Sequence, residues 1–167
     1  MDVRGREWSG VGKIYGQERG RIDGNGRIRI TPRFLSFFRT TDELVALHCL
    51  PEGAMGIYPH SVWNKMRQNE PRPAERAADS MVFRRKLRRF GAFTQTTTIT
   101  NQGRITIPPL FRPLLNLEPR TDIILVGCEI GLEIWNADNW QREFERLRTH
   151  ELEKGDAEMQ AELENIR

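Results

Sequence analysis

Polar and apolar residues alternate in two short segments of this 167-residue chain. Residues 27–30 read Arg-Ile-Arg-Ile, and residues 104–107 read Arg-Ile-Thr-Ile. A period of two is typical of a strand with one buried face, so both segments are predicted to be strands whose isoleucines point inward. Residues 24–26 (Gly-Asn-Gly) and 101–103 (Asn-Gln-Gly) precede them and predict tight hairpin turns, because Gly and Asn tolerate positive φ.

These two segments belong to a longer internal repeat. Residues 22–34 return as residues 99–111 at an offset of 77, and the same offset relates Trp63 to Trp140. A shared offset over that length indicates a duplicated structural unit. Because two copies are too few for a solenoid, we expect two half-domains that complete one pseudo-symmetric core.

The remaining elements follow from apolar runs and the residues that interrupt them. Prolines 32, 108 and 109 end the predicted strands and open short helical turns. Further strands are predicted at residues 44–50, 56–58, 123–128 and 132–135, and helices at 61–68, 74–90 and 137–148. Five basic residues within 84–89 either contact phosphates or form the solvated face of the second helix, and we favour the solvated face.

The predicted elements divide the chain into five segments. These are an N-terminal extension (1–12), a first repeat (13–69), a linker and connecting helix (70–90), a second repeat (91–150) and an acidic tail (151–167). The apolar residues of the tail have near-helical spacing, so it is expected to be either an amphipathic helix or a solubilising tail.

Composition points to the cytoplasm. No apolar run approaches the roughly 20 residues of a membrane span, and the N-terminus has no apolar signal region. Cys49 and Cys128 occupy matched repeat positions and are expected to be buried strand residues of a reduced protein, although a disulfide between them is the alternative.

Charge is unevenly distributed along the chain. Residues 1–150 carry 24 Lys and Arg against 17 Asp and Glu, a net of +7, whereas residues 151–167 carry 2 against 6, a net of −4. A basic body suggests a polyanionic partner. The alternative is a solvated surface that is simply rich in arginine.

Arg27 is the first candidate for binding chemistry. It follows the first hairpin turn on a strand whose isoleucines face inward, so its side chain is expected to project outward. A guanidinium can hold a phosphate, or the O6/N7 edge of guanine, through two hydrogen bonds. Asp23 can accept turn amides and orient Arg27, although a structural Asp–Arg clamp without a ligand would use the same residues.

The other candidates lie around the two turns. The predicted DNA-binding residues are Arg21, Arg27, Arg29, Asn101, Gln102 and Arg104, and the residues predicted to support the motif are Asp23, Gly26, Thr100 and Gly103. Arg33 and Arg112, just past the prolines, are expected to support the structure through the short helices.

The repeated motif resembles the MraZ family of bacterial transcription regulators. The resemblance runs from about Lys13 to His150, and two departures from the family pattern are Tyr15 and Thr100, which replaces the motif aspartate in the second copy. It rests on Asp23-x-x-x-Arg27 with its Ile-x-Ile strand, and on Ile57-Tyr58-Pro59, Leu125-Val126-Gly127 and Glu133-Ile134-Trp135.

The resemblance implies an α+β, β-rich fold: a pseudo-symmetric double swapped-hairpin, AbrB-like β-barrel of two tandem repeats with short flanking helices. It implies a sequence-specific regulator that binds repeated double-stranded DNA sites in the promoter of a division and cell-wall gene cluster containing its own gene. It also implies a ring-like homo-oligomer associated with the nucleoid.

An AbrB-like antitoxin or another protein-interaction module is the alternative function. Enzymatic activity is not expected, because the chain lacks a complete dinucleotide loop and a phosphate-binding Gly-Lys-Ser/Thr motif. Its three histidines are scattered and no Cys-x-x-Cys occurs, so no metal site is expected. No cofactor, membrane partner or small-molecule ligand is indicated.

Overall fold

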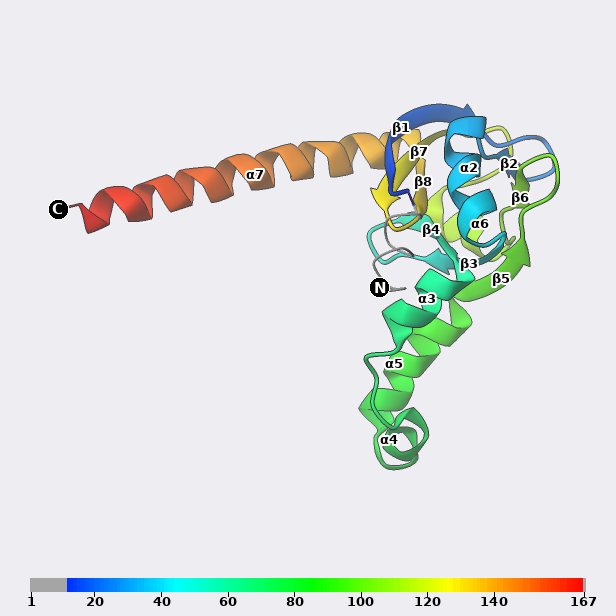
Figure 1. The fold of residues 1–167 in the computed structure, drawn as a ribbon, viewed down its shortest axis with the longest axis horizontal. Coiled ribbons are helices and arrows are strands. Elements are labelled where there is room, and N and C mark those ends of the chain that lie inside the picture. The colour runs from blue at the N-terminus through cyan, green and yellow to red at the C-terminus, as the bar shows by residue number, and fades with distance from the viewer. Residues whose placement is uncertain (1–11, 167) are drawn as a thin grey trace, which may run out of the picture. The chain divides into compact units, whose positions relative to one another are not determined.

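Eight strands build the first of two units in the computed structural model, which describes residues 12–166 (Figure 1). The expected N-terminal extension, except Gly12, lies outside the described residues. The units are residues 1–136 and 137–167. The strands are β1 (Ile14–Arg21), β2 (Arg27–Arg29), β3 (Leu44–Cys49), β4 (Ala54–Pro59), β5 (Thr94–Thr98), β6 (Arg104–Thr106), β7 (Asp122–Glu129) and β8 (Leu132–Asn136).

Strand pairing exchanges elements between the two repeats. Six strands form an antiparallel sheet in the order β1-β7-β8-β4-β3-β5, and β2 pairs with β6 in a separate ribbon. Thus β1 of the first repeat pairs with β7 of the second, and β5 pairs with β3 in the mirrored arrangement. This order places strands of both halves of the chain in one sheet, and the chain belongs to the predicted α+β class.

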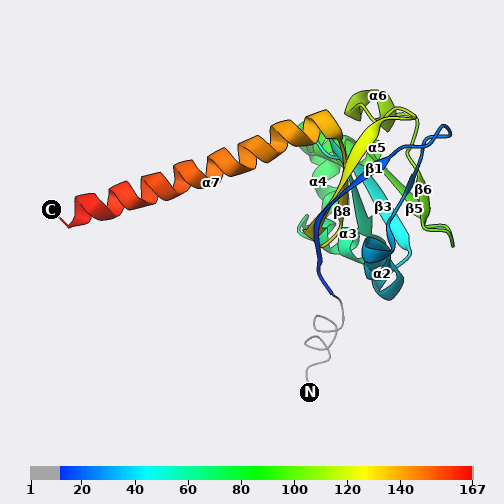
Figure 2. The same cartoon turned by 90° about the horizontal axis from the view of Figure 1, so that it is seen from above.

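The predicted barrel is not confirmed. The outer strands β1 and β5 lie at opposite ends of the sheet and do not pair with each other, so hydrogen bonds do not close the sheet. The ribbon instead packs its inward side chains over the core. Both hairpin turns, between β1 and β2 and between β5 and β6, project at the same end of the unit (Figures 1 and 2).

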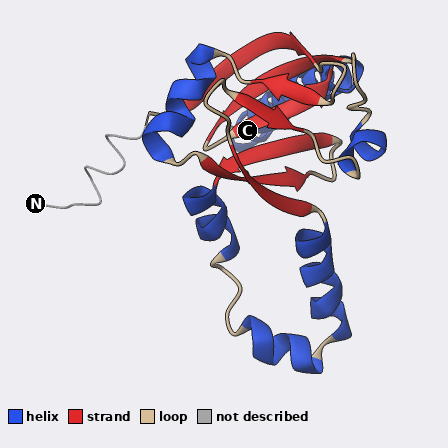
Figure 3. Cartoon of the chain, turned by 90° about the vertical axis from the view of Figure 1, so that its right-hand side faces the viewer, coloured by secondary structure: helices blue, strands red, loops and turns tan. Residues whose placement is uncertain are grey.

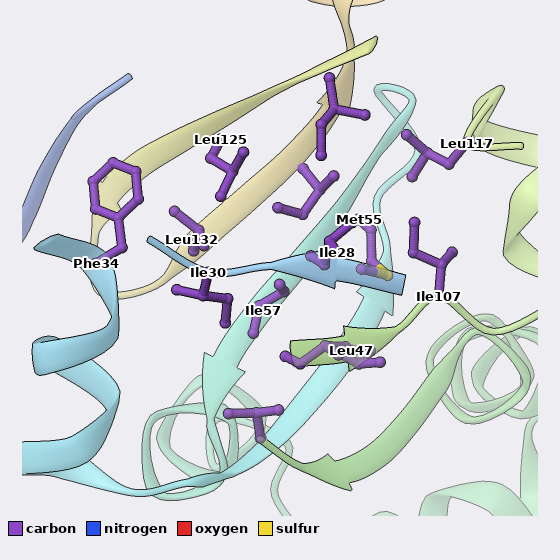
Figure 4. Close-up of a cluster of buried hydrophobic side chains, with 14 of the residues drawn as sticks. Ile28, Ile30, Phe34, Leu47, Met55, Ile57, Ile107, Leu117, Leu125 and Leu132 are labelled. Carbon is purple, nitrogen blue, oxygen red and sulfur yellow. The ribbon is translucent and has the colours of Figure 1, made fainter. Parts of the chain in front are cut away.

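The alternating isoleucines of the ribbon form the centre of the core, as predicted. Ile28 and Ile105 face each other across the ribbon and are almost fully buried. Ile30 and Ile107 extend the same apolar layer, in which Leu47 of β3 also lies (Figure 4). Each such burial stabilises the fold by about 1.5–3 kcal/mol, so the register of the ribbon is fixed by its apolar face.

Short helices follow the prolines, again as predicted. Helix α2 (Pro32–Thr41) has proline in its first turn, where the missing N–H costs no hydrogen bond, and α6 spans Phe111–Leu115. Phe34 and Phe111 occupy matched positions at the starts of these helices and are both buried. The helices therefore cover the core beside the ribbon.

Three helices leave the sheet between β4 and β5 (Figure 3). They are α3 (His60–Arg67), α4 (Pro73–Asp79) and α5 (Met81–Ala92). The single helix predicted over 74–90 is wrong, because Ser80 has an extended backbone (φ −124°, ψ 115°). Its hydroxyl accepts a hydrogen bond from the Phe83 amide at 3.0 Å, which caps α5 and explains the break.

An aromatic cluster joins these helices to the outer face of the sheet. His48 of β3 is 3% exposed, and its ring lies 4.9 Å from that of Trp63 and 5.4 Å from that of Phe90. The neighbouring Cys49 points to the opposite face, into the main core, and both cysteines are free thiols. Burial lowers the pKa of His48 to about 4.

The second unit is one helix, α7 (Ala137–Asn165), of 29 residues. The predicted end of this helix near Arg148 is wrong. The helix continues through the acidic tail, which is therefore helical, the first of the two expected alternatives. Gly155 costs roughly 1 kcal/mol in a helix interior, which the surrounding good helix formers offset. No helix among residues 12–166 is both long and apolar enough to cross a membrane.

Candidate nucleic-acid interface

Each hairpin turn closes in the same way. In the first, the Gly26 amide donates to the Asp23 carbonyl at 3.1 Å and the Asp23 amide donates to the Arg27 carbonyl at 2.9 Å. Thr100, Gly103 and Arg104 repeat these bonds in the second turn, at 2.8 and 3.1 Å. Gly26 and Gly103 both have φ +77°, a backbone conformation that favours glycine. This conformation explains why both turns have glycine at this position.

The Asp23 carboxylate organises the first turn. One oxygen (Oδ1) accepts the amides of Asn25 at 2.8 Å and Arg27 at 2.9 Å. The other (Oδ2) accepts the Arg27 Nε at 3.0 Å. The backbone bond from Arg27 is the main cause that lowers the pKa of Asp23, followed in the same direction by the Asn25 amide and the Arg27 side chain. The predicted orienting contact is thus present, and the Arg27 side chain stays 39% exposed.

Thr100 reproduces only part of this network. Its hydroxyl accepts the Arg104 amide at 2.9 Å, and the Arg104 guanidinium is held instead by Gln102 Oε1 at 3.1 Å. Arg39 of α2 stabilises the same turn by donating to the carbonyls of Thr100 and Asn101, both at 3.0 Å. The second arginine is therefore oriented by a neutral amide rather than by a carboxylate.

The ribbon brings the arginines of both repeats onto one face. Arg27 lies opposite Thr106 and Arg29 lies opposite Arg104, while the paired isoleucines between them face the core. Directly opposite side chains on paired strands are about 4.5–5.5 Å apart at Cβ, and like charges there are destabilising. An anion bound across the ribbon would therefore relieve the repulsion between Arg29 and Arg104.

The remaining predicted residues lie around this face. Arg21 ends β1 and approaches Asp122 at 3.7 Å, with both side chains exposed. Asn101 and Gln102 are exposed in the second turn. Arg33 donates to the Tyr15 carbonyl at 3.0 Å and Arg112 to the Ile107 carbonyl at 3.1 Å, so both brace the backbone as predicted.

Two arginines near the turns were missed by the sequence reasoning. Arg39 contacts the second turn, and Arg120 lies beside the first, where its guanidinium is 3.2 Å from the position that a side chain on Gly24 would take. Both belong to segments far from the turns in sequence. No local pattern marks them, because only the exchange of strands between repeats brings them there.

The described residues contain no cluster of three or more His, Cys, Asp or Glu that could hold a metal ion. The interface therefore consists of guanidinium and amide groups on a two-stranded ribbon and its turns. Such groups bind phosphates and base edges.

Comparison with known proteins identifies similar chains. Residues 92–163 match the family model described as "MraZ protein, putative antitoxin-like". The curated protein "Transcriptional regulator MraZ" of Syntrophobacter fumaroxidans is 34% identical over 137 residues, which cover 78% of this chain and 85% of the relative. Proteins of that name from Thermomicrobium roseum (31% over 130 residues; 75% and 83%) and Desulforapulum autotrophicum (32% over 133 residues; 80% and 86%) are also similar.

Proposed function

Since this chain belongs to the MraZ family, we propose that it is a sequence-specific DNA-binding transcriptional regulator. The three similar proteins described above are named as transcriptional regulators. The observation that carries the proposal is the ribbon face, on which Arg29 opposes Arg104 beside an Arg27 already oriented by Asp23.

The geometry supports a division of labour on DNA. A two-stranded β-ribbon fits the major groove of B-DNA. Arg27, whose Nε is held by Asp23, presents the rest of its guanidinium to a guanine edge. Arg21, Arg29 and Arg104 neutralise phosphates, and the amides of Asn101 and Gln102 approach base edges from the second turn.

The finer features extend this proposal. Residues 13–69 and 91–150 form two AbrB-like repeats, and the regulator binds repeated sites in the promoter of the division and cell-wall gene cluster that contains its own gene. A ring-like homo-oligomer, bound to the nucleoid in the cytoplasm, would engage several such sites at once, which raises avidity without new contacts. One ribbon is a small footprint for specific recognition, and this supports the oligomer.

A fluorescence-anisotropy titration tests the proposal. Duplexes from the region upstream of the gene are compared with shuffled duplexes of equal composition at one fixed salt concentration. Specific proteins bind their sites typically 10³–10⁷-fold more tightly than other DNA, so a large preference for the upstream duplexes is expected. Equal affinity for both sets would overturn sequence-specific regulation.

The alternative, an AbrB-like antitoxin or protein-interaction module, is favoured by the description of the matching family model. In that case a partner protein is recognised and the ribbon arginines contribute little to DNA binding. The same titration, repeated at several salt concentrations, separates the two, because an interaction module without a DNA role shows no salt-sensitive retention of any duplex.

A further inference from the structure

An arginine with a left-handed backbone lies beside the first hairpin turn. Arg120, in the loop between α6 and β7, has φ +67°, a conformation that glycine adopts freely and that a Cβ disfavours. Residues held in this region cluster at ligand-binding sites, where the strain is retained for function. The position of the Arg120 side chain indicates which function that is.

The loop that carries Arg120 is fixed to the base of the first turn. The Arg120 amide donates to the Ile22 carbonyl at 2.8 Å, and the Ile22 amide donates to the Thr121 carbonyl at 3.0 Å. The Arg120 guanidinium lies against the turn itself, with Nη2 at 3.2 Å from the position that a Cβ on Gly24 would take. The lack of a side chain on Gly24 therefore leaves room for the guanidinium beside the turn backbone.

The Arg120 guanidinium has no partner among residues 12–166. No carboxylate lies within ion-pairing distance of it and no carbonyl accepts a hydrogen bond from it, and the side chain is partly exposed. Arg39, beside the second turn, is engaged in contrast: it donates to two carbonyls of that turn and pairs with Glu43 at 2.7 Å. The first turn therefore has beside it an uncompensated cation that the second turn lacks.

The matching position beside the second turn is an aspartate. There the Ile99 amide donates to the Glu43 carbonyl at 3.1 Å, which repeats the bond at the base of the first turn. The residue before Glu43 is Asp42, which therefore corresponds to Arg120, and its backbone is extended, with φ −168°. Its carboxylate accepts the Leu44 amide at 3.1 Å. The same turn thus forms beside a residue of opposite charge, so folding alone does not explain Arg120.

We propose that Arg120 binds a backbone phosphate of DNA at the first turn, next to the base edge that Arg27 reads. The inference rests on the proposed function. A guanidinium holds phosphate oxygens through two hydrogen bonds, and none of the guanidinium donors of Arg120 is committed elsewhere. Because phosphate contacts position a protein on the duplex and carry no sequence information, Arg120 adds affinity and fixes the turn, while Arg27 supplies specificity.

Arg120→Gly tests this contact, because it removes the guanidinium and also relieves the left-handed backbone. The melting temperature should stay the same or rise, whereas affinity should fall for upstream and shuffled duplexes alike. The slope of log affinity on log salt, measured by anisotropy from about 50 to 200 mM salt, should become shallower by about 0.9, the value for one phosphate. The preference for upstream over shuffled duplexes should persist, because Arg27 is intact.

Arg72→Gly is the matched control. Arg72 also has a left-handed backbone (φ 49°), is exposed, and lies just before α4, away from the two turns (Figure 1). The substitution therefore removes one positive charge and relieves the same conformation, and its salt slope should equal that of the wild type. Arg120→Lys keeps the charge in the unchanged loop and should retain most of the slope, because an ammonium also binds phosphate.

The outcomes separate this contact from the proposed function. A slope that is unchanged in Arg120→Gly, or reduced equally in Arg72→Gly, overturns the phosphate contact while leaving DNA binding established. Loss of the preference for upstream duplexes in Arg120→Gly also overturns it, because a phosphate contact does not distinguish sequences. A wild-type protein that binds no duplex overturns the proposed function and the contact together.

Discussion

Arg27 and Arg104 occupy equivalent positions but should contribute unequally to DNA binding. The Arg27 side chain is held by a carboxylate that also fixes two turn amides, whereas Arg104 has one hydroxyl contact at its amide and one neutral partner for its guanidinium. A charge-assisted hydrogen bond is roughly twice as strong as a neutral one. Arg27 is therefore the better oriented of the two before DNA arrives.

The magnitude follows from the contacts. Arg27→Ala should cost about 1–3 kcal/mol at the specific site, or about 5- to 150-fold in affinity, if Arg27 reads guanine. Arg104→Ala should cost less by about 1 kcal/mol, the typical net value of one hydrogen bond. Thr100→Asp supplies the missing carboxylate and should make the second turn behave like the first, increasing the loss caused by Arg104→Ala in that background.

The assay is anisotropy on one upstream duplex at fixed salt, with circular dichroism to confirm that each variant is folded. Arg33→Ala is a control for loss of an arginine that braces the backbone instead. Equal losses for Arg27→Ala and Arg104→Ala would refute the asymmetry and show that a hydroxyl caps the turn as effectively as the carboxylate.

Three further predictions follow. His48 binds a proton more weakly in the folded chain (pKa about 4) than in the unfolded chain (pKa 6.5), so the free energy of unfolding should be highest above pH 6.5 and fall by about 2 kcal/mol toward pH 4.5. Denaturant titrations should show this loss, and His48→Phe should abolish it. Gly26→Ala should destabilise the protein by at least about 1 kcal/mol, because Gly26 has φ +77° and Arg112 occupies the place that a Cβ would take. Gly24→Ala is the matched control and should change the melting temperature little, because a Cβ there meets only the flexible end of Arg120. Light scattering should give a mass well above that of a dimer, and a monomer at micromolar concentration that retains full DNA affinity would contradict the proposed ring.

The sequence predicted the parts of the fold that depend on local pattern. Alternating isoleucines located both ribbon strands, and glycine after Asp23 or Thr100 located both turns, because these signals act within a few residues. The pairing of β1 with β7 and of β5 with β3 was not predicted, since the repeat and the family resemblance indicated only that the two halves share one core. The break at Ser80 was missed, since the residues around it have ordinary helix propensity and the serine that caps α5 was not recognised as a helix start.

The candidate nucleic-acid interface, like the fold, was predicted from the sequence only where it depends on local pattern. The Asp23–Arg27 contact follows from a four-residue spacing across a tight turn, which the sequence contains. That Arg29 opposes Arg104 depends on the ribbon register, set by the burial of Ile28 against Ile105 over a long sequence separation. Arg39 and Arg120 were not identified, because helix α2 and the loop after α6 reach the turns only in the folded chain.

Footprinting on the region upstream of the gene tests the central claim most directly. Wild-type protein should protect discrete, repeated short sites at a concentration where shuffled DNA of equal length is unprotected, and Arg27→Ala should lose that protection while remaining folded. Uniform protection of both DNAs, or none of either, would contradict a sequence-specific regulator that reads DNA through the β2–β6 ribbon.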